Sequence, residues 1–310
     1  MDISVVIINW NTKELVLQCI RSVYDTISGL DVEIWMVDNG SSDGSVEAVK
    51  ETFPAVRIIE NGENLGFAKA NNRALAKISG KYALLLNSDA VLTPGAVAAL
   101  FNFMERTPEA GMTCGQLLNE DGSLQNSFAN FPTLASLLVN ESALRLIAPH
   151  RYKSKTFSAS GPAEIESGIG ACLMVRKAAM ETVGLMDERY FFFLEETDWA
   201  LCMRRAGWKS FFVPGARIYH FQGRSVGHSI NSRILYYESR YLYFKKWHSS
   251  VYWMVPCLVF SRLLVNLAAN GAGVVLTLGL AAGLRAKLSV YAGLLRWHFS
   301  NLQTVFSKQS

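Results

Sequence analysis

The chain has 310 residues, of which 50% are hydrophobic and 18% are charged, and its formal net charge at pH 7 is +4. This length and composition allow a sizeable buried core and exclude a globally disordered chain. The mild charge gives no reason to expect a nucleic-acid partner. The charge is uneven, however: residues 236–310 contain eight basic residues and one acidic residue, whereas the first 235 contain 22 and 25.

Cysteine usage and the N-terminal segment bear on the compartment. Five cysteines are scattered singly, with no Cys-x-x-Cys pair, which is typical of a reducing compartment. The apolar run over residues 5–8 has only the length of a strand, and Asp2 stands where a secretory signal has a basic residue. We therefore expect the first three-quarters of the chain to lie in the cytosol.

The first hundred residues alternate between strand and helix patterns. Short apolar runs predict strands, and the segments between them have the apolar spacing of helices. The predicted strands cover residues 3–8, 33–37, 56–60 and 82–86, and the predicted helices cover residues 13–24, 45–52, 67–79 and a segment opened by Pro94. Wholly apolar strands that alternate with helices indicate a parallel sheet covered on both faces.

Polar clusters follow these strands, and ligands of such sheets bind outside the carboxyl ends of the strands. The clusters cover residues 9–11, 38–43, 61–66 and 87–89. We expect them to share one ligand-binding rim. Beyond residue 111 the pattern is less regular, with an aromatic block over residues 190–193 and a predicted helix over residues 196–206. From residue 236 the chain is predicted to form a separate helical element.

Asp38 is the first candidate for ligand binding. It follows a buried strand and precedes Asn39-Gly40-Ser41-Ser42-Asp43-Gly44. Its carboxylate can accept hydrogen bonds from a base or a ribose, while the glycines let a ligand approach the backbone. A solvated Asx turn is the alternative. The chain has no Gly-x-Gly-x-x-Gly after its first strand and no Walker-type lysine loop, which argues against an ordinary dinucleotide or P-loop fold.

Asn87-Ser88-Asp89 ends the fourth predicted strand. A divalent cation that bridges phosphates takes oxygen ligands and keeps several waters. Asp89 is the candidate anionic ligand, and Asn87 can add an amide oxygen or hold a metal-bound water; a strand-end turn is the alternative. His220 is a lone histidine after a later strand and is either a packed side chain or a ligand. No second histidine near it in sequence supports a zinc site.

Three carboxylates, Glu195, Glu196 and Asp198, follow the aromatic block. An apolar wall and neighbouring acids both raise carboxyl pKa values, which suits a general base. The alternative is that a helix dipole favours acids in its first turn. This alternative fits Asp198 best, because it lies in the first turn and is followed by Arg204 and Arg205.

Together, seven motifs in this order resemble those of the family 2 inverting glycosyltransferases, in the bacterial rhamnosyltransferase-like branch. The resemblance covers roughly residues 1–230. The motifs are Ser4-Val5-Val6-Ile7-Ile8-Asn9-Trp10-Asn11, Val37-Asp38-Asn39-Gly40-Ser41-Ser42-Asp43-Gly44-Ser45, Asn64-Leu65-Gly66-Phe67-Ala68-Lys69-Ala70-Asn71-Asn72, Leu84-Leu85-Leu86-Asn87-Ser88-Asp89, Gly170-Ala171-Cys172-Leu173-Met174-Val175-Arg176, residues 191–199 with Arg204-Arg205-Ala206-Gly207-Trp208, and His220 with Gly223 and Ser225.

The resemblance implies an α/β fold of the glycosyltransferase A type, which is a Rossmann-like mixed sheet with helices on both faces. A catalytic domain would cover residues 1–235, with its nucleotide-sugar half in residues 1–110 and its acceptor and base half in residues 111–235. Residues 236–310 would form a C-terminal amphipathic helical extension, basic and apolar, that associates with a membrane.

The resemblance also implies the site residues. The nucleotide-sugar donor would contact Asn9, Asn11, Asp38, Asn39, Asn64, Gly66, Phe67, Asn71, Asn87 and Ser88. Asn87 and Asp89 occupy the two ends of the family's Asp-x-Asp metal motif, and His220 matches a histidine that joins the Mg²⁺ or Mn²⁺ ion. Because Asn87 is neutral, the metal site loses one charge. Gly170 and Asp198 would lie on the acceptor side.

In the family the base is the second acid of a pair, which corresponds to Glu196, with Glu195 as the alternative. The implied reaction is an in-line displacement that transfers one sugar to a lipid-linked glycan in cell-surface polysaccharide synthesis, with dTDP-rhamnose as the favoured donor. UDP- or GDP-sugar donors are the first alternative. A non-catalytic nucleotide-sugar-binding subunit is the second, and only the neutral Asn87 favours it.

The tail bears on membrane association. Residues 263–284 carry no charge and are long enough to span a bilayer, but they contain Asn266 and Asn270, and basic residues flank both sides. One-sided positive charge is typical of a span, whereas helices in the interface carry bases throughout. We favour a peripheral or re-entrant tail on an anionic surface, at the cytoplasmic face of the bacterial inner membrane. A spanning helix and a soluble or homo-oligomeric packing face are the alternatives.

Overall fold

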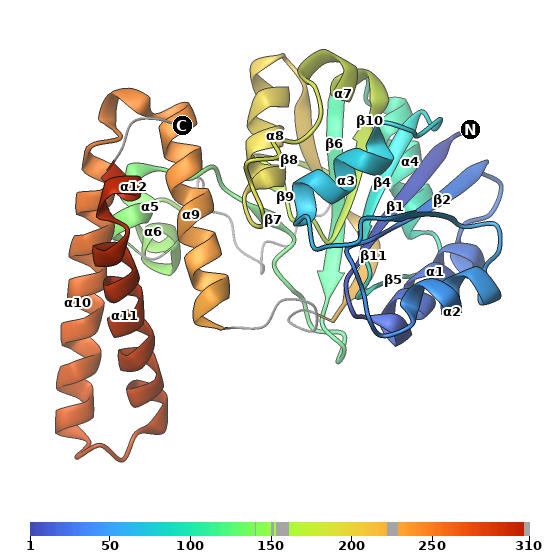
Figure 1. Cartoon of the computed structure of the whole chain (residues 1–310). Coiled ribbons are helices and arrows are strands. Elements are labelled where there is room, and N and C mark those ends of the chain that lie inside the picture. Colours follow the sequence, from blue (N-terminus) through green and yellow to red (C-terminus); the bar gives the residue numbers. More distant parts are fainter. Residues whose placement is uncertain (140, 150–151, 153–160, 222–228, 307–310) are drawn as a thin grey trace. The chain divides into compact units, whose positions relative to one another are not determined.

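The computed structural model describes the chain apart from residues 140, 150–151, 153–160, 222–228 and 307–310. The chain divides into two compact units (Figure 1). Unit 1 comprises Met1–Phe131 and Lys153–Val226, and unit 2 comprises Pro132–Tyr152 and Gly227–Ser310. This division differs from the continuous boundary expected at residue 235, because residues 132–152 belong with the C-terminal helices.

The first half of unit 1 is a parallel sheet with the strand order β3-β2-β1-β4. The predicted strands are present as β1 (Ile3–Asn9), β2 (Val32–Asp38), β3 (Arg57–Glu60) and β4 (Tyr82–Asn87). The predicted helices are present as α1 (Lys13–Thr26), α2 (Ser45–Thr52), α3 (Phe67–Leu75) and α4 (Ala96–Arg106). In the register of β1 and β2, Asn9 pairs with Asp38, so both strands end at the same level.

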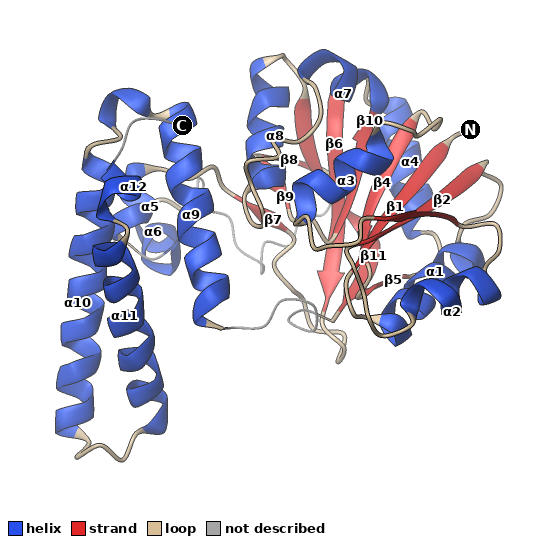
Figure 2. Cartoon of the chain, viewed as in Figure 1, coloured by secondary structure: helices blue, strands red, loops and turns tan. Residues whose placement is uncertain are grey.

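The second half of the sheet mixes strand directions (Figure 2). Its strands are β5 (Ala90–Leu92), β6 (Ala110–Leu118), β8 (Ala163–Ile165), β10 (Cys172–Arg176) and β11 (Lys209–His220). β10 is antiparallel to β4 and β6, and β11 is parallel to β6 but antiparallel to β5 and β8. The mixed sheet of the glycosyltransferase A type is therefore confirmed. The apolar pattern alone predicted a parallel sheet, which holds for the first half only.

Helices cover both faces of this sheet because β1 presents apolar side chains in both directions. Ile3, Val5 and Ile7 join one buried cluster together with residues of α1 and α4. Val6 joins the other cluster, which contains residues of α3, α7 (Lys177–Val183) and α8 (Glu195–Arg205). Alternate residues of a strand point to opposite faces, so a wholly apolar strand must be covered on both. A short second sheet pairs β7 (Phe128–Ala129) with β9 (Ser167–Gly168).

Unit 2 is helical. Its helices are α5 (Leu134–Leu138), α6 (Glu141–Ile147), α9 (Ile230–Trp247), the 3₁₀ helix η1 (Ser249–Val251), α10 (Met254–Leu276), α11 (Ala282–Ser300) and α12 (Leu302–Phe306). Arg240 of α9 and Arg262 of α10 both donate to the Ser136 carbonyl, at 2.8 and 2.9 Å. Cations that bind the last carbonyls of a helix stabilise its C-terminus. These contacts explain why α5 belongs with the C-terminal helices.

α10 and α11 form a hairpin joined by a short turn (Figure 1). The turn falls inside the uncharged stretch that the sequence offered as one span, so that stretch is divided between two helices. Within the described part of the chain, one helix, Met254–Leu276, is long and apolar enough to cross a bilayer. This finding rests on its length and composition alone. Most of its side chains are not covered by the rest of the protein.

Candidate active site

The carboxyl ends of β1, β2 and β4 carry a buried hydrogen-bond network that we call the rim network, made of Asn9, Thr12, Asp38, Ser41 and Ser88. Asn9 Nδ2 donates to Asp38 Oδ1 at 2.9 Å, and the Ser41 N–H donates to Asp38 Oδ2 at 2.8 Å. The Thr12 hydroxyl lies 2.8 Å from Asn9 Oδ1 and 2.9 Å from the Ser88 hydroxyl. Three of the predicted polar clusters thus meet.

The fourth cluster joins the rim through Asn39. Its Nδ2 donates to the Gly66 carbonyl at 3.1 Å and lies 3.3 Å from Asn64 Oδ1, which also accepts from the Gly66 N–H. Asn61 Nδ2 donates to Asn39 Oδ1 at 2.8 Å. Asn11, with a φ of 52°, accepts from the Ser42 N–H at 2.8 Å. The loop after β2 and the loop after β3 are therefore fixed to each other by amide side chains.

Gly66 permits a close approach between this loop and the aromatic block. Its φ is 78°, and a Cβ at this position would lie 2.2 Å from the Phe191 carbonyl oxygen. The same carbonyl accepts from the Phe67 N–H at 2.8 Å. Only glycine fits here, both for its backbone conformation and for the missing side chain. Asn71 differs from the other predicted donor ligands, because its Nδ2 donates to the Phe67 carbonyl of its own helix.

Asp89 and His220 are brought together by the pairing of β5 with β11. Ala90 pairs with His220, and the Phe221 N–H donates to the Asp89 carbonyl at 2.9 Å. His220 Nε2 lies 3.4 Å from Asp89 Oδ1, and both side chains are buried. These two predicted metal ligands are 131 positions apart in sequence, so their proximity is a property of the fold.

Gln125, which is not among the predicted site residues, holds the histidine. Its Nε2 donates to the His220 carbonyl at 2.6 Å, so its Oε1 faces His220 Nδ1 at 3.0 Å. Because an amide oxygen only accepts, Nδ1 donates to it, and Nε2 is the ring nitrogen that faces Asp89. Gln125 lies in a polar stretch that looks like a surface loop in sequence, and nothing there marks it. Gly223 and Ser225 lie outside the described residues.

These residues fit a divalent cation of the Mg²⁺ or Mn²⁺ type. The donors are the carboxylate oxygen of Asp89 and the imidazole nitrogen of His220, with Asn87 two residues from Asp89. No group of three His, Cys, Asp or Glu side chains able to hold a metal occurs among the residues that the structure describes. A closed protein cage is therefore absent from that part of the chain. Mg²⁺ typically uses one or two protein ligands, waters and substrate phosphates.

The two glutamates lie at the N-terminus of α8, after Phe193 and Leu194, which both have positive φ. Such conformations are strained for bulky residues and often occur at functional sites. A Cβ at Gly170 would lie 3.5 Å from the Phe67 ring and 3.9 Å from Glu196 Cδ. Glu196 is thus next to the loop that carries Gly66, and it is half-buried, whereas Glu195 is buried.

Burial raises the pKa of both carboxyls. The negative charge of Glu196 raises the pKa of Glu195 further, while backbone N–H groups at Glu196, Gly170 and Thr197 limit the rise in the pKa of Glu196. Among the described residues, neither Glu195 Oε2 nor Glu196 Oε2 has a hydrogen-bond partner. Carboxyls with raised pKa values beside a polar rim have the properties of a general base.

Asp198, three residues after Glu195, is bonded to the aromatic block. Its Oδ1 accepts from the Tyr190 hydroxyl at 3.2 Å, and its side chain is 1% exposed. This contact fastens the aromatic block to α8. The indole of Trp199 donates to the Gly184 carbonyl at 2.9 Å, which also anchors this helix.

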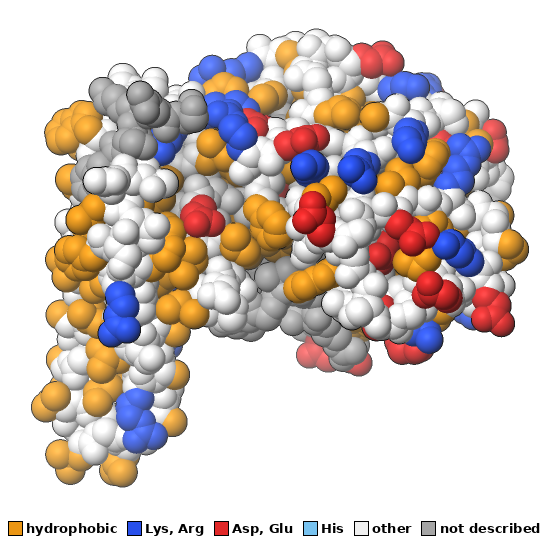
Figure 3. All heavy atoms as spheres, in the orientation of Figure 1, with side chains coloured by type: hydrophobic (Ala, Val, Ile, Leu, Met, Phe, Trp, Pro, Cys, Tyr) orange, Lys and Arg blue, Asp and Glu red, His pale blue; other side chains and the backbone are white. Residues whose placement is uncertain are grey.

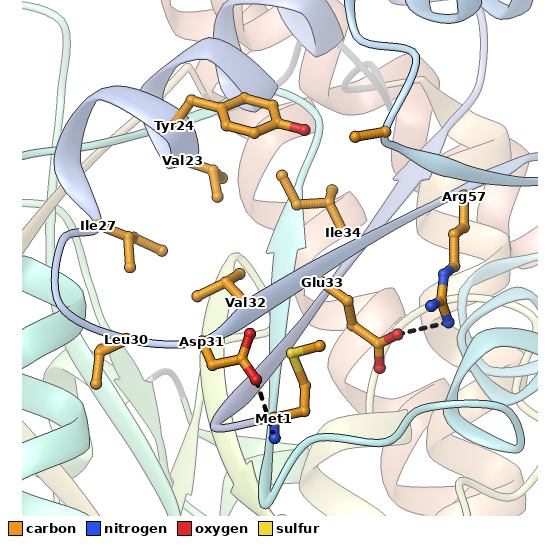
Figure 4. A pocket seen from close by; sticks show the side chains of 11 residues that line it. Met1, Val23, Tyr24, Ile27, Leu30, Asp31, Val32, Glu33, Ile34 and Arg57 are labelled. Carbon is orange, nitrogen blue, oxygen red and sulfur yellow. Dashed lines mark ion pairs between the residues drawn. The ribbon is translucent and has the colours of Figure 1, made fainter.

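A pocket of about 490 Å³ lies at the opposite edge of the sheet (Figure 4). It is lined by residues at the amino ends of β1 and β2, including Met1, Val32 and Glu33. Its charged groups are paired: the N-terminal amine with Asp31 at 3.2 Å, and Glu33 with Arg57 at 2.7 Å. Ligands of such sheets bind at the carboxyl ends, so this pocket is not the candidate active site.

The mixed sheet and the polar rim at its strand ends define a glycosyltransferase A-type fold. The family model described as glycosyl transferase family 2 matches residues 4–184, so the chain belongs to this family and is a glycosyltransferase. This confirms the resemblance found in its motifs.

Two curated relatives and two solved structures illustrate the likeness. The N-acetylglucosaminyl-diphospho-decaprenol L-rhamnosyltransferase of Mycobacterium tuberculosis is 29% identical over 244 residues, which cover 73% of this chain and 78% of the relative. The low-salt glycan biosynthesis hexosyltransferase Agl10 of Haloferax volcanii is 24% identical over 211 residues, covering 66% of this chain and 62% of the relative. The name of the first relative gives rhamnose as the sugar that it transfers.

The solved structures show the fold. The mannosyltransferase PcManGT from Pyrobaculum calidifontis, solved with GDP-Man and Mn²⁺, has a TM-score of 0.58 at 18% identity, covering 97% of this chain and 86% of that one. GalNAc-T7, solved with UDP, GalNAc and Mn²⁺, has a TM-score of 0.56 at 18% identity, covering 79% of this chain and 50% of that one.

Proposed function

We propose that this glycosyltransferase moves one sugar, with inversion, from a nucleotide-diphosphate sugar to a lipid-linked glycan, at the cytoplasmic face of the bacterial inner membrane. dTDP-rhamnose is the favoured donor. The observation that carries the proposal is a continuous line of contacts across one edge of the sheet. It runs from the proposed base, Glu196, through Gly170, Phe67 and Gly66 to the amides and carboxylates of the strand ends.

The strand-end half of this line would bind the donor. Asn39 bridges the Gly66 loop to the rim, and the rim network continues from Asp38 to Ser88. Asp38 accepts one hydrogen bond at each carboxylate oxygen, which leaves lone pairs for a base or ribose. Asn87 joins the two halves, because its N–H donates to the Ala171 carbonyl at 3.0 Å, directly after Gly170.

The metal ligands would be Asp89 and His220, with Asn87 contributing an amide oxygen or holding a bound water. When bound, a divalent cation neutralises the charge of the diphosphate leaving group. The relatives solved with Mn²⁺ support a metal of this kind. The neutral Asn87 predicts weaker binding than a site with acids at both positions would give.

Glu196 would take the proton of the acceptor hydroxyl. Its raised pKa makes the carboxylate a stronger base than an exposed glutamate, and the neighbouring Gly170 has no side chain that could hinder an acceptor. The attacking oxygen then forms its bond to the anomeric carbon from the face opposite the nucleotide. The bond between that carbon and the diphosphate breaks in the same displacement, and the proton remains on Glu196 until solvent removes it.

The donor assignment rests on the Mycobacterium relative, whose name gives rhamnose as the transferred sugar and a diphospho-decaprenol as the acceptor carrier. UDP- and GDP-sugars remain the alternative, because amide and carboxylate groups of the rim do not select one base. A panel of dTDP-, UDP- and GDP-sugars, each with and without Mn²⁺, tests this by thermal shift. A ligand at 100 times its Kd raises the free energy of unfolding by about 2.7 kcal/mol. If no nucleotide diphosphate shifts the transition, the transferase proposal fails.

A non-catalytic nucleotide-sugar-binding subunit is the second candidate function, and the neutral Asn87 is the observation that favours it. It predicts a thermal shift with a nucleotide sugar but no product. The Asn87→Asp variant separates the two candidates. An enzyme with a weakened metal site should bind Mn²⁺ more tightly and still turn over, whereas the subunit should gain metal affinity without any transfer.

A further inference from the structure

The hairpin of α10 and α11 ends in an apolar tip, which we define as Val275, Leu276, Leu278 and Leu280. Their side chains are 73%, 84%, 87% and 83% exposed, which makes them among the most exposed large apolar side chains of the described chain. Figure 3 shows hydrophobic side chains gathered at the free end of this hairpin, with basic side chains beside them. We infer that this tip inserts shallowly into an anionic phospholipid surface.

The backbone of the tip is suited to an apolar environment. The N–H groups of Thr277, Leu278, Gly279 and Leu280 all donate to carbonyls within the hairpin, at 2.8–3.1 Å. The Thr277 hydroxyl donates to the Gly273 carbonyl at 2.8 Å. Unpaired backbone groups are costly in hydrocarbon, and this turn leaves none of these four donors unpaired.

The helices behind the tip pack through small residues. A Cβ at Gly273 would lie 2.9 Å from Leu284 Cδ1, and one at Gly271 would lie 3.7 Å from Leu288 Cδ1. Two helices therefore approach closely without needing the hydrophobic effect between them, as helices in lipid do. The hairpin can keep its shape when water around its tip is replaced by lipid.

Two basic residues follow the tip and limit how deeply it inserts into the lipid. Arg285 and Lys287 lie three and five residues into α11, or about 5–8 Å along its axis at 1.5 Å per residue. Interfacial elements bury their apolar side about 5–10 Å below the headgroups, so the bases would meet lipid phosphates when the tip meets acyl chains. Arg285 also donates to the Gly279 carbonyl at 2.6 Å, which holds it beside the tip. The sequence contains no acidic residue after Glu238 to oppose this attraction.

Deeper insertion of the hairpin is disfavoured by the charges of Arg285 and Lys287. If the hairpin entered to the level of Leu264, about 18 Å from Leu276, both bases would lie in hydrocarbon, where charged side chains are strongly disfavoured. If the tip crossed to the far side, the bases would be translocated, against the preference of positive charge for the cytoplasmic side. Arg262 is bound to carbonyls of α5 and marks where the hairpin packs against its own unit.

The inference rests on the proposed function only for its purpose, which is to bring the enzyme to a lipid-linked acceptor. Vesicle co-sedimentation of the full chain tests it without any substrate. Vesicles of phosphatidylcholine alone are compared with vesicles that also contain phosphatidylglycerol. The tip variant combines Leu276→Ser, Leu278→Ser and Leu280→Ser, and the matched control combines Leu264→Ser and Val265→Ser, which change two exposed apolar residues far from the tip.

We expect the tip variant to lose about a hundredfold or more in partitioning, the control to bind like the parent chain, and anionic lipid to strengthen binding in a salt-sensitive way. Replacing Lys287 by Gln should reduce binding to the anionic vesicles only. Equal loss in the control would overturn the shallow geometry in favour of a flat or deep one. Unchanged binding of the tip variant would overturn the membrane role. The same holds if the parent chain is a dimer in solution and the tip variant is a monomer, because the tip would then be a dimer interface.

Depth has its own readout. In a Leu278→Trp variant, bromine placed near the headgroup end of the acyl chains should quench the tip fluorescence more than bromine near the methyl end, and the reverse result contradicts shallow insertion. Thermal shift with nucleotide sugars needs no vesicles, so failure of the transferase proposal and failure of this inference are separable.

Discussion

The two units use apolar and polar residues in opposite ways. In unit 1 the apolar strands are buried on both faces, and buried polar side chains such as Asn9, Asp38 and Ser88 gather at one edge. In unit 2 the apolar residues at the end of the hairpin are exposed. A buried polar group must be satisfied by partners or by a ligand, whereas an exposed apolar surface calls for an apolar partner. We therefore propose that the first unit carries out the chemistry and that the second contacts the carrier of the acceptor.

The largest effect should come from Glu196, the proposed base in unit 1. Glu196→Gln keeps the shape of the side chain but cannot take a proton, so transfer should fall about 10²- to 10⁴-fold. Donor binding, measured by thermal shift, should be retained. Glu181→Gln, an exposed position on α7, is the control and should leave transfer unchanged. Near-normal turnover of the Glu196 variant would contradict this assignment and favour Glu195 as the base.

Gly66 offers the sharpest structural test of the same unit. A methyl group there would collide with the Phe191 carbonyl in a left-handed conformation, so Gly66→Ala should lower the free energy of unfolding by about 2–5 kcal/mol. Gly62 lies in the same loop with a φ of 75° and has nothing within 4 Å of the added Cβ. Gly62→Ala should therefore cost only about 1–2 kcal/mol. Equal costs in denaturant titrations would show that the contact with Phe191 is not tight.

Substitutions of Gln125 test whether its contact with His220 supports metal binding. Gln125→Met removes the acceptor that faces His220 Nδ1, and partners of this kind typically change metal affinity 10- to 100-fold. We expect a loss of that size in Mn²⁺ affinity, followed by electron paramagnetic resonance on the protein without donor. Gln125→Glu keeps an acceptor for Nδ1 but loses the donor to the His220 carbonyl, so it should restore binding only in part. If both variants bind Mn²⁺ like the parent chain, the contact is structural only.

The stability of unit 1 should depend on pH through the ionisation of Glu195. Burial and the charge of Glu196 raise the pKa of Glu195 well above 4.5 in the folded protein. The free energy of unfolding therefore falls as the pH rises from 4.5 towards this higher pKa. Glu195→Gln removes this penalty. The variant should therefore be more stable than the parent at pH 8 and gain little at pH 4, as followed by hydrogen exchange of α8. A gain that does not change with pH would show that the carboxyl is not strained by its charge.

The smallest effect, of opposite sign, is expected in unit 2. His298 is fully buried among the rings of Tyr237, Tyr241, Phe260 and Trp297, and its Nδ1–H donates to the Leu294 carbonyl at 2.8 Å. Burial lowers its pKa from 6.5, so unfolding takes up a proton and stability falls as the pH drops through that value. Fluorescence of Trp297 should report this loss between pH 8 and pH 5, and His298→Phe should abolish it. The two tyrosines titrate far above this range.

Much of unit 1 was predictable because its signals are local. The alternation of apolar strands and helices gave eight elements of the first half, and the polar residues after each strand predicted the rim, since parallel strands end at one edge. The reversed direction of β10 was not readable from its apolar residues, which are the same in either direction. Gln125 was missed for a similar reason, because a polar residue in a loop looks the same whether it is solvated or bonded to a histidine 95 positions away.

The sequence by itself determined the family, the strand-end acids and amides, and the uneven charge of the tail, because these depend on residue type and order. Tertiary structure decided which of them meet. Strand pairing brings Asp89 to His220, a missing side chain at Gly66 lets the aromatic block reach the rim, and two arginines draw residues 132–152 into the helical unit. It also divides the uncharged stretch at a turn, since helix length and packing depend on neighbours that lie far away along the chain.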